Sequence, residues 1–509
     1  MQAQKFRPIV LTTTGKYIKR SLTTVAAAAK EDVSEDIPLK SWKEIPGPKS
    51  LPVIGTLHHF LPGGLFQNLN GIELTNKLYD TYGPIVRLDA VLGRDPILLV
   101  SDAESASQVL RGENRYPIRP GFQTLQYYRQ NVKQTTKGRP TGLITDHGEL
   151  WQELRSAVNP VLLQPKTIKL YTSVLDQVAV DMIARMKSLR DENNMLKGKF
   201  DQEMNLWSLE SIGIVALGCR LGCLEPNLPE NSPAQQLIQC VHELFVLADK
   251  LDFKPSIWKM VATPTFKKAM KLYELHETLS KHFIDQAIKE LNTKQKSDNE
   301  KGILEKLLEI NEDFAHIMAA DMLFAGVDTA ANTIAATLYL LAVNPEKQTK
   351  LREELRSKEE KRSYLKACLK ESLRLMPVVG GNIRVTTKDY NLLGYKIPPN
   401  MQVAFGHQNM SLMEEHYPRA KEFLPERWLV NKDHPLHYRQ AHPFAYSVFG
   451  FGVRSCIGRR IAELEIETFT ARLVENFQIE WFGQPPKVEQ TSLNYIKGPF
   501  NFVFNDAPQ

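Results

Sequence analysis

Cysteine is scarce in this chain, which has five cysteines among 509 residues. So few argue against a disulfide framework and indicate a reducing compartment. Cys219 and Cys223 lie four positions apart, but no histidine or cysteine nearby completes the tetrahedral ligand set of zinc. The pair therefore does not predict a zinc site. The five are Cys219, Cys223, Cys240, Cys368 and Cys456.

A strong charge of either sign is also missing. The 64 basic and 58 acidic residues give a net charge of +6, dispersed along the chain. This balance is too mild to predict nucleic-acid binding, although it allows a local basic face for an acidic protein. With 42% apolar and 24% charged residues, the composition is that of an ordinary globular chain, soluble or peripherally bound to a membrane. The length by itself allows about three domains.

Acidic residues are absent before Glu31, whereas basic residues, serines, threonines and an alanine run are present. This composition is typical of a mitochondrial transit peptide. A membrane anchor needs about 20 apolar residues, and the early apolar runs, Pro8 to Leu11 and Val25 to Ala29, are far shorter. We therefore predict a presequence and linker over residues 1–40, cleaved between Val25 and Ile45. A disordered basic tail is the alternative.

The most specific stretch is the loop 449–458, FGFGVRSCIG. Its glycines permit tight turns and a close approach of the backbone to a flat ligand. Arg459 to Asn476 are predicted to form an amphipathic helix, so Cys456 lies just ahead of a helix N-terminus. The helix end and Arg454 are expected to lower the pKa of the thiol. A thiolate placed in this way suits an axial position of a haem iron, and a buried structural cysteine is the alternative.

This loop resembles the haem-binding signature of the cytochrome P-450 family at Phe449, Gly452, Arg454, Cys456 and Gly458. Val448, where the family more often has proline, is a small departure. The resemblance spans Ile45 to about Phe504. It implies one large domain over 41–509, mainly α with a small β-rich portion, built around a haem b with O2 as co-substrate. Cys456 is then the metal ligand, and Phe449 and Arg454 also bind the cofactor.

Two further patterns resemble cofactor-binding positions of the family. Trp151 and Arg155 are four apart, on one helix face, and resemble a Trp-x-x-x-Arg motif whose side chains bind a haem propionate. A charge-assisted bond from an arginine to a carboxylate is sound chemistry. Arg384 matches a further propionate-binding arginine. A tryptophan and an arginine on one helix are common, so this interpretation depends on Cys456.

The apolar segment from Asp313 to Val343 predicts a helix of about 45 Å. Gly326 at its centre costs about 1 kcal/mol relative to alanine, so something should compensate. Residues 325–329, AGVDT, resemble the oxygen-activation motif of the family, with Asp328 and Thr329 as the catalytic acid and alcohol. A carboxylate and a hydroxyl can relay protons. The motif favours monooxygenation over rearrangement; plain helix packing is the alternative.

Glu371 and Arg374 are three apart on a predicted helix and can pair there. With Arg427 they resemble the structural Glu–Arg–Arg network of the family, expected to lock the core near the haem. Lys366 and Lys370, about a quarter turn away on the same helix, are predicted to face solvent.

These two lysines, with Arg459 and Arg460, resemble the ferredoxin-docking residues of mitochondrial-class members of the family. Opposite charge would steer docking of an acidic iron–sulfur protein and make turnover sensitive to salt. A solvated basic face is the alternative.

Local patterns predict several other elements. They are a helix over Ile72 to Tyr82, strands over Ile85 to Asp89 and Pro96 to Val100, and a next helix that Ser101 can cap. The loop 256–261, which contains Trp258 and follows Lys250 and Lys254, suits the interface of an anionic bilayer; ordinary loop packing is the alternative. Between Asn344 and Tyr364 the chain is shorter than is usual in the family, either as a lineage trait or because the chain is incomplete.

These features predict a mitochondrial haem-thiolate monooxygenase, resembling the insect mitochondrial clan, on the matrix side of the inner membrane. It would hydroxylate an apolar small molecule, a steroid or a foreign compound, with electrons from a mitochondrial ferredoxin and its reductase. It would touch the membrane peripherally and bind no nucleic acid. A non-catalytic haem-thiolate carrier or sensor and a haem-thiolate isomerase remain as alternatives.

Overall fold

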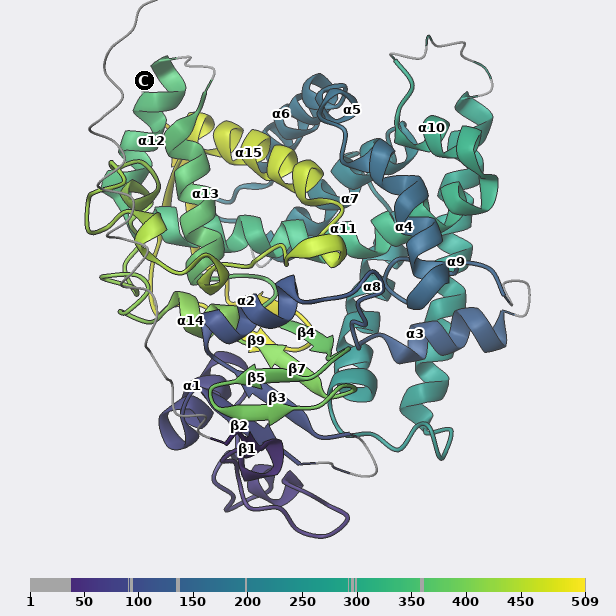
Figure 1. Cartoon of the computed structure of the whole chain (residues 1–509). Helices are drawn as coiled ribbons and strands as arrows, with labels where there is room; N and C mark the ends of the chain where they lie inside the picture. The colour runs from purple at the N-terminus through teal and green to yellow at the C-terminus, as the bar shows by residue number, and fades with distance from the viewer. Residues whose placement is uncertain are drawn as a thin grey trace, which may run out of the picture. The chain divides into compact units, whose positions relative to one another are not determined.

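The computed structural model describes residues 38–89, 91, 95–133, 138–196, 199–291, 293, 297, 300–357 and 361–508. The chain divides into two units, Met1–Lys40 and Ser41–Gln509. The predicted presequence lies outside the described residues, apart from residues 38–40. The second unit is mainly helical with a small β-rich portion, as predicted (Figure 1).

The helical elements are as follows. The α-helices are α1 (Gly71–Tyr82), α2 (Ala103–Arg111), α3 (Gln123–Tyr127), α4 (Gly148–Leu162), α5 (Pro165–Lys169), α6 (Thr172–Leu189), α7 (Phe200–Leu217), α8 (Pro233–Ala248), α9 (Pro264–Leu291), α10 (Ile303–Ile310), α11 (Glu312–Ala342), α12 (Pro345–Ser357), α13 (Ser363–Leu375), α14 (His407–Ser411) and α15 (Arg459–Asn476). Short π-helices are η3 (Tyr128–Val132) and η5 (Asp249–Phe253). Short 3-10 helices are η1 (Trp42–Glu44), η2 (Leu57–Phe60), η6 (Pro425–Trp428), η7 (Tyr438–Gln440), η8 (Pro443–Ala445) and η9 (Gly452–Arg454).

The strands are β1 (Lys40–Ser41), β2 (Ile85–Leu88), β3 (Ile97–Val100), β4 (Asn382–Val385), β5 (Tyr390–Leu392), β6 (Tyr395–Ile397), β7 (Gln402–Phe405), β8 (Phe477–Trp481), β9 (Lys487–Gln490), β10 (Asn494–Lys497) and β11 (Phe502–Asp506). The order β2-β3-β7-β4 forms a four-stranded sheet, in which β3 and β7 run parallel and the outer pairs are antiparallel. The register places Val100 opposite both Ile85 and Phe405. Antiparallel pairs form between β5 and β6, β8 and β11, and β9 and β10.

Local sequence signals explain the ends of several elements. Helix α1 stops at Gly83, whose positive φ of 92° favours glycine. The predicted cap of α2 is wrong by one residue: Asp102, not Ser101, is the N-cap, and its carboxylate accepts the N–H of Ser105 at 2.7 Å. The helix predicted over Arg459 to Asn476 is confirmed as α15.

Helix α11 runs through the middle of the helical part, with α7 and α15 beside it (Figure 1). The mid-helix Gly326 is explained by packing, because a Cβ there would lie 2.5 Å from Cγ1 of Ile212 on α7. On the same helix, the Ser208 hydroxyl contacts the carbonyl oxygens of Gly326 and Val327 at 3.0 and 2.8 Å. Close approach of α7 therefore compensates for the glycine.

In the part of the chain that is described, no single helix is long and apolar enough to cross a membrane. Helices α11 and α12 pass that test as a pair by length and composition, with a bend of 108° between them. In the shortened region, α12 ends at Ser357 and α13 begins at Ser363, while residues 358–360 lie outside the described ones.

Candidate active site

The loop around Cys456 has a backbone that its glycines make possible. Gly450 and Gly452 have φ values of 72° and 71°, the left-handed region in which other residues are strained. The Cys456 N–H donates to the carbonyl oxygen of Phe449 at 2.8 Å, which closes the loop on itself. Helix α15 begins three residues later. The loop thus fixes the sulfur just ahead of a helix N-terminus.

Four arginines from distant parts of the chain gather at this loop. Arg155 on α4 donates from Nη2 to the carbonyl oxygen of Ser455 at 3.0 Å. Arg454 lies over the ring of Trp151, with 3.9 Å between its Cζ and the ring centroid. Arg119 and Arg384 complete the group, because each acts electrostatically on Arg454. We call Arg119, Arg155, Arg384 and Arg454 the arginine cluster.

The arginine cluster carries more positive charge than its neighbours neutralise. Burial, followed by Arg119, Arg384 and Arg155, lowers the pKa of Arg454 to about 8. Burial lowers the pKa of Arg155 to about 10. Arg384 pairs with Glu113 at 2.5 Å. The Nε of Arg155 is buried and has no hydrogen-bond partner among the described residues. Arg454 already donates to the carbonyl oxygens of Pro117, Leu143 and Asp146. The propionates of a haem would add negative charge to the cluster, and one of them could accept a hydrogen bond from Nε of Arg155.

The prediction that the helix end and Arg454 lower the pKa of the Cys456 thiol is wrong in its net direction. Cys456 is exposed by its accessible surface, although protein atoms surround its sulfur closely enough to desolvate a thiolate. Burial is the largest influence and raises the pKa. The backbone of Gly458, followed by Arg155, Arg119 and Arg459, lowers it less. Burial therefore outweighs the local positive charge at this thiol.

Asp328 and Thr329 lie in the middle of α11. The Thr329 hydroxyl donates to the carbonyl oxygen of Ala325 at 2.7 Å, one turn earlier. Asp328 is 1% exposed, and its Oδ2 accepts a 2.5 Å hydrogen bond from the hydroxyl of Tyr495 on β10. The carboxylate is thus held by a strand that follows it by more than 150 residues.

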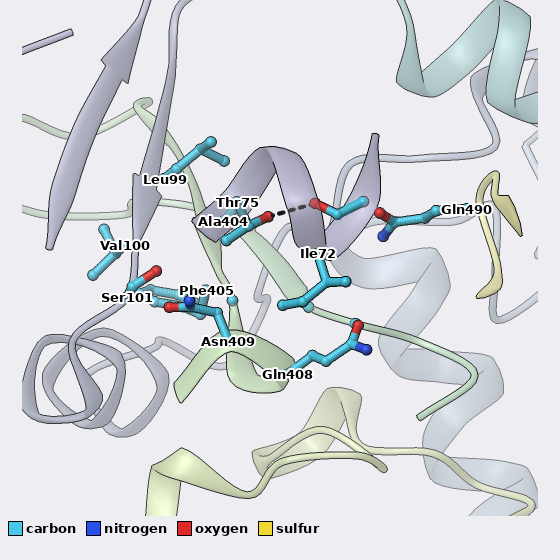
Figure 2. Close-up of a pocket in the computed structure, with 14 residues that line it drawn as sticks. Ile72, Thr75, Leu99, Val100, Ser101, Ala404, Phe405, Gln408, Asn409 and Gln490 are labelled. Atoms are coloured by element: carbon cyan, nitrogen blue, oxygen red, sulfur yellow. Dashed lines mark hydrogen bonds between the residues drawn. The ribbon is translucent and has the colours of Figure 1, made fainter. Parts of the chain in front are cut away.

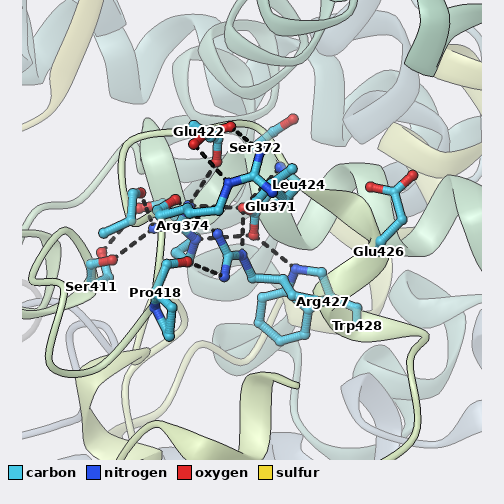
Figure 3. Close-up of polar contacts among 12 residues, drawn as sticks. Glu371, Ser372, Arg374, Ser411, Pro418, Glu422, Leu424, Glu426, Arg427 and Trp428 are labelled. Atoms are coloured by element: carbon cyan, nitrogen blue, oxygen red, sulfur yellow. Dashed lines mark hydrogen bonds and ion pairs between the residues drawn. The ribbon is translucent and has the colours of Figure 1, made fainter. Parts of the chain in front are cut away.

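Glu371, Arg374 and Arg427 come together as a fully buried network (Figure 3). Glu371 Oε1 accepts Nη2 of Arg374 at 2.8 Å and Nε of Arg427 at 2.9 Å, and Oε2 accepts Nε of Arg374 at 2.9 Å. The indole N–H of Trp428 donates to Oε2 at 2.9 Å, and the N–H of Leu424 donates to Oε1 at 3.2 Å. The two arginines also donate to backbone carbonyl oxygens, those of Ser411, Ala420, Glu422, Pro418 and Arg419.

The four predicted docking cations are exposed. Lys366 lies against α15, with its Nζ 3.9 Å from a carboxylate oxygen of Glu467. Lys370 lies over Trp428, 5.6 Å from the ring centroid. They face solvent on α13 while Glu371 is buried on the same helix, as the helical spacing predicts. The other two cations are Arg459 and Arg460 at the start of α15.

The prediction that Trp258 faces a membrane is wrong, because its side chain is packed inside the protein. Trp258 is buried, its indole N–H donates to the carbonyl oxygen of Leu251 at 3.0 Å, and its ring stacks on Phe266. Neighbouring apolar side chains are exposed instead: Met260 by 79% and Val261 by 58%. An apolar surface is therefore present in this loop, but Trp258 does not form it.

A pocket of about 130 Å³ lies between α1, the four-stranded sheet and α14 (Figure 2). Its polar lining includes Ser101, Gln408, Asn409 and Gln490. The residues of the arginine cluster, Cys456, Asp328 and Thr329 do not line it. This pocket is therefore separate from the candidate active site.

Sequence reasoning missed three residues of the site: Arg119, Glu113 and Tyr495. Glu113 and Arg119 precede α3 in an irregular segment, and Tyr495 lies in a four-residue strand. Each of these residues joins the site through an interaction with a residue that is distant in sequence, so no local sequence pattern predicts its role.

Comparisons with known proteins identify the family and the fold. The sequence model of the family described as Cytochrome P450 matches residues 45–504. Cytochrome P450 CYP12A2 of Musca domestica is 37% identical, over 96% of this chain and 94% of the relative. The probable mitochondrial cytochrome P450 12a5 of Drosophila melanogaster is 35% identical, over 100% of this chain and 98% of the relative. The solved structure of the retinoic acid-bound cyanobacterial CYP120A1 superposes with a TM-score of 0.70 at 19% identity, covering 92% of this chain and all of the other.

Proposed function

The chain belongs to the cytochrome P450 family, and on that premise we propose that it is a mitochondrial enzyme that hydroxylates an apolar small molecule with electrons from a ferredoxin. Members of the family are monooxygenases that use a thiolate-ligated haem and O2. Several relatives from Drosophila melanogaster are named mitochondrial, and residues 1–30, the first part of the predicted presequence and linker, have the composition of a transit peptide. A fusion of residues 1–40 to a reporter should enter mitochondria, and failure to do so would contradict the proposed location.

The observation that carries the proposal is the arginine cluster beside Cys456. Cys456 would ligate the iron through its sulfur, and Arg119, Arg155 and Arg384 with Arg454 would hold the propionates. The unpartnered Nε of Arg155 is one donor ready for a carboxylate. The chemistry that the haem supplies when bound is reductive activation of O2 at a thiolate-ligated iron. We also assign Trp151 and Phe449 to the walls of this site.

Asp328 and Thr329 would supply the protons that O2 reduction consumes. A carboxylate that exchanges protons and a hydroxyl one residue later form a relay along α11. If Thr329→Ala leaves the ratio of product formed to electrons consumed unchanged, this assignment is wrong. Measuring product and electron consumption also separates the proposal from its alternatives. A carrier would form no product, and an isomerase would turn over without external electrons.

The electron donor would bind at the exposed cations of α13 and α15. Lys370→Glu should raise the KM for ferredoxin by roughly tenfold and weaken its salt dependence, because charge complementarity controls encounter. Lys281→Glu on α9 is the matched control, since Lys281 is an exposed lysine in an i,i+4 pair with Asp285. Equal effects of the two variants would contradict docking at α13.

The substrate class can be tested by optical titration of the ferric protein with sterols and with small foreign apolar compounds. A tight and selective response to one sterol would support biosynthetic hydroxylation. Weak responses to many unrelated compounds would support detoxification. The exposed Met260 and Val261 would touch the inner membrane on its matrix side. Met260→Asp should reduce cosedimentation with anionic vesicles if they do.

A further inference from the structure

The buried carboxylate of Asp328 has a second neighbour besides Tyr495. Nδ1 of His242 on α8 lies 3.4 Å from Oδ2 of Asp328. The imidazole also packs edge-on against the Tyr495 ring, with 4.9 Å between the centroids. Three elements that are distant in sequence, α8, α11 and β10, therefore meet at one carboxylate oxygen.

These three side chains differ in their exposure to solvent. The side chain of Asp328 is 1% exposed and that of His242 is 36% exposed. Tyr495 is 4% exposed. Of the three, the histidine is the one that solvent reaches, so it connects bulk water to a carboxylate in the core. Histidine is suited to that position because an imidazole can act as a general acid and a general base.

Tyr495 is a fixed donor at this site. Burial, followed by the charge of Asp328, strongly raises the pKa of Tyr495, so its hydroxyl keeps its proton. The charged groups beside it, Lys497 and Glu489, pair with each other across β9 and β10 at 3.5 Å. The tyrosine therefore holds Oδ2 in place, while Oδ1 of Asp328 is buried and has no hydrogen-bond partner in the part of the chain that is described.

We propose that His242 supplies protons from solvent to Asp328, and that Tyr495 is the positioning residue that orients the carboxylate for this transfer. The proposal rests on the proposed function. Hydroxylation converts substrate–H, O2, two electrons and two protons into substrate–OH and water. The electrons come from the ferredoxin, and both protons end in the water molecule. Each proton would pass from His242 Nδ1 to the carboxylate, and His242 would regain one from solvent.

The central experiment compares His242→Gln with His242→Lys. His242→Gln removes the acid–base group and should lower kcat roughly tenfold or more. The KM for substrate should stay unchanged, the solvent isotope effect should increase, and more electrons should end in hydrogen peroxide. His242→Lys places a permanent positive charge beside Asp328, and lysine holds its proton tightly at neutral pH. His242→Lys should therefore fail to restore the coupling of electrons to product. If lysine did restore coupling, His242 would act only through its charge and the proposal would be overturned.

A second measurement is independent of turnover. In the haem-loaded protein with 13C-labelled histidine, the His242 signal is identified by its absence from His242→Gln. That signal should shift in Asp328→Asn and in Tyr495→Phe, whereas the signal of His282 on α9 should not. An unshifted His242 signal would refute the contact and with it the proposal.

Different results would contradict the proposed function and the proton supply through His242. If the wild-type protein forms no product with ferredoxin, the proposed function fails. If the wild type turns over, and both His242→Gln and His242→Lys match it in kcat, coupling and isotope effect, the proton supply through His242 is wrong while the monooxygenase stands.

Discussion

Replacing Glu371 by glutamine should destabilise the protein more than any change of one surface charge. Glu371 accepts five hydrogen bonds, and its two arginine partners are fully buried. Glutamine keeps the shape but removes the negative charge and places an amide NH2 among donors. Breaking a buried ion pair costs about 3–5 kcal/mol. Since the unfolding entropy of a chain this size is roughly 1 kcal/mol per kelvin, the apparent Tm should fall by about 3–5 °C.

The assay is thermal unfolding followed by far-UV circular dichroism, at one scan rate and with matched haem content. Glu422→Gln is the control, because Glu422 forms an exposed ion pair with Arg419 close to the same network. Its Tm should stay within error of the wild type. A Glu371→Gln protein that melts together with Glu422→Gln would refute the reasoning, since the buried arginines would then tolerate the loss of their counter-charge.

Three other outcomes follow from the same structure. Arg155→Ala should lower the haem-to-protein ratio after gel filtration, and full retention of haem would remove Arg155 from the propionate site. Gly326→Ala should destabilise the protein by about 1–3 kcal/mol in urea titrations because its Cβ meets Ile212, and the cost should be smaller in an Ile212→Ala background; equal costs would disprove the clash. Burial lowers the pKa of His276 from 6.5 to about 3, so the unfolded chain takes up a proton that the folded chain does not. Stability should therefore decline as the pH falls from about 6.5 towards 4, and His276→Leu should flatten that decline in urea midpoints, unlike His282→Leu.

The long helices could be predicted closely from the sequence. Helix α15 has the predicted bounds, and α11 differs from the prediction by one residue at each end. Both segments are long and lie between clear signals: a glycine precedes α15, and Asn311 caps α11 through the N–H of Phe314. The pairing of Glu371 with Arg374 could also be predicted, because residues three apart lie on one helix face, whereas Arg427 came only from the family resemblance.

The errors arose where the result depends on the surroundings in three dimensions. Ser101 and Asp102 are both good capping residues, and the local pattern could not rank them. Trp258 looks the same in sequence whether its ring is buried or exposed. At Cys456, the local charges were visible in the sequence, but the amount of protein around the sulfur was not. The contacts of Tyr495 with Asp328 and of Glu113 with Arg384 join residues 167 and 271 positions apart.

The arginine cluster also determines when the site can form during synthesis. Its members lie at positions 119, 155, 384 and 454, so the site closes a loop of more than 300 residues between its first and last arginine. Bringing such distant segments together is slow, because the entropy of loop closure must be overcome before the contacts form. A nascent chain that has not yet released residues 450–460 from the ribosome lacks both the sulfur and the last arginine. Under the proposed assignment of Cys456 and Arg454, capture of the cofactor would follow the synthesis of residues 450–460, and a chain truncated before them would lack that step.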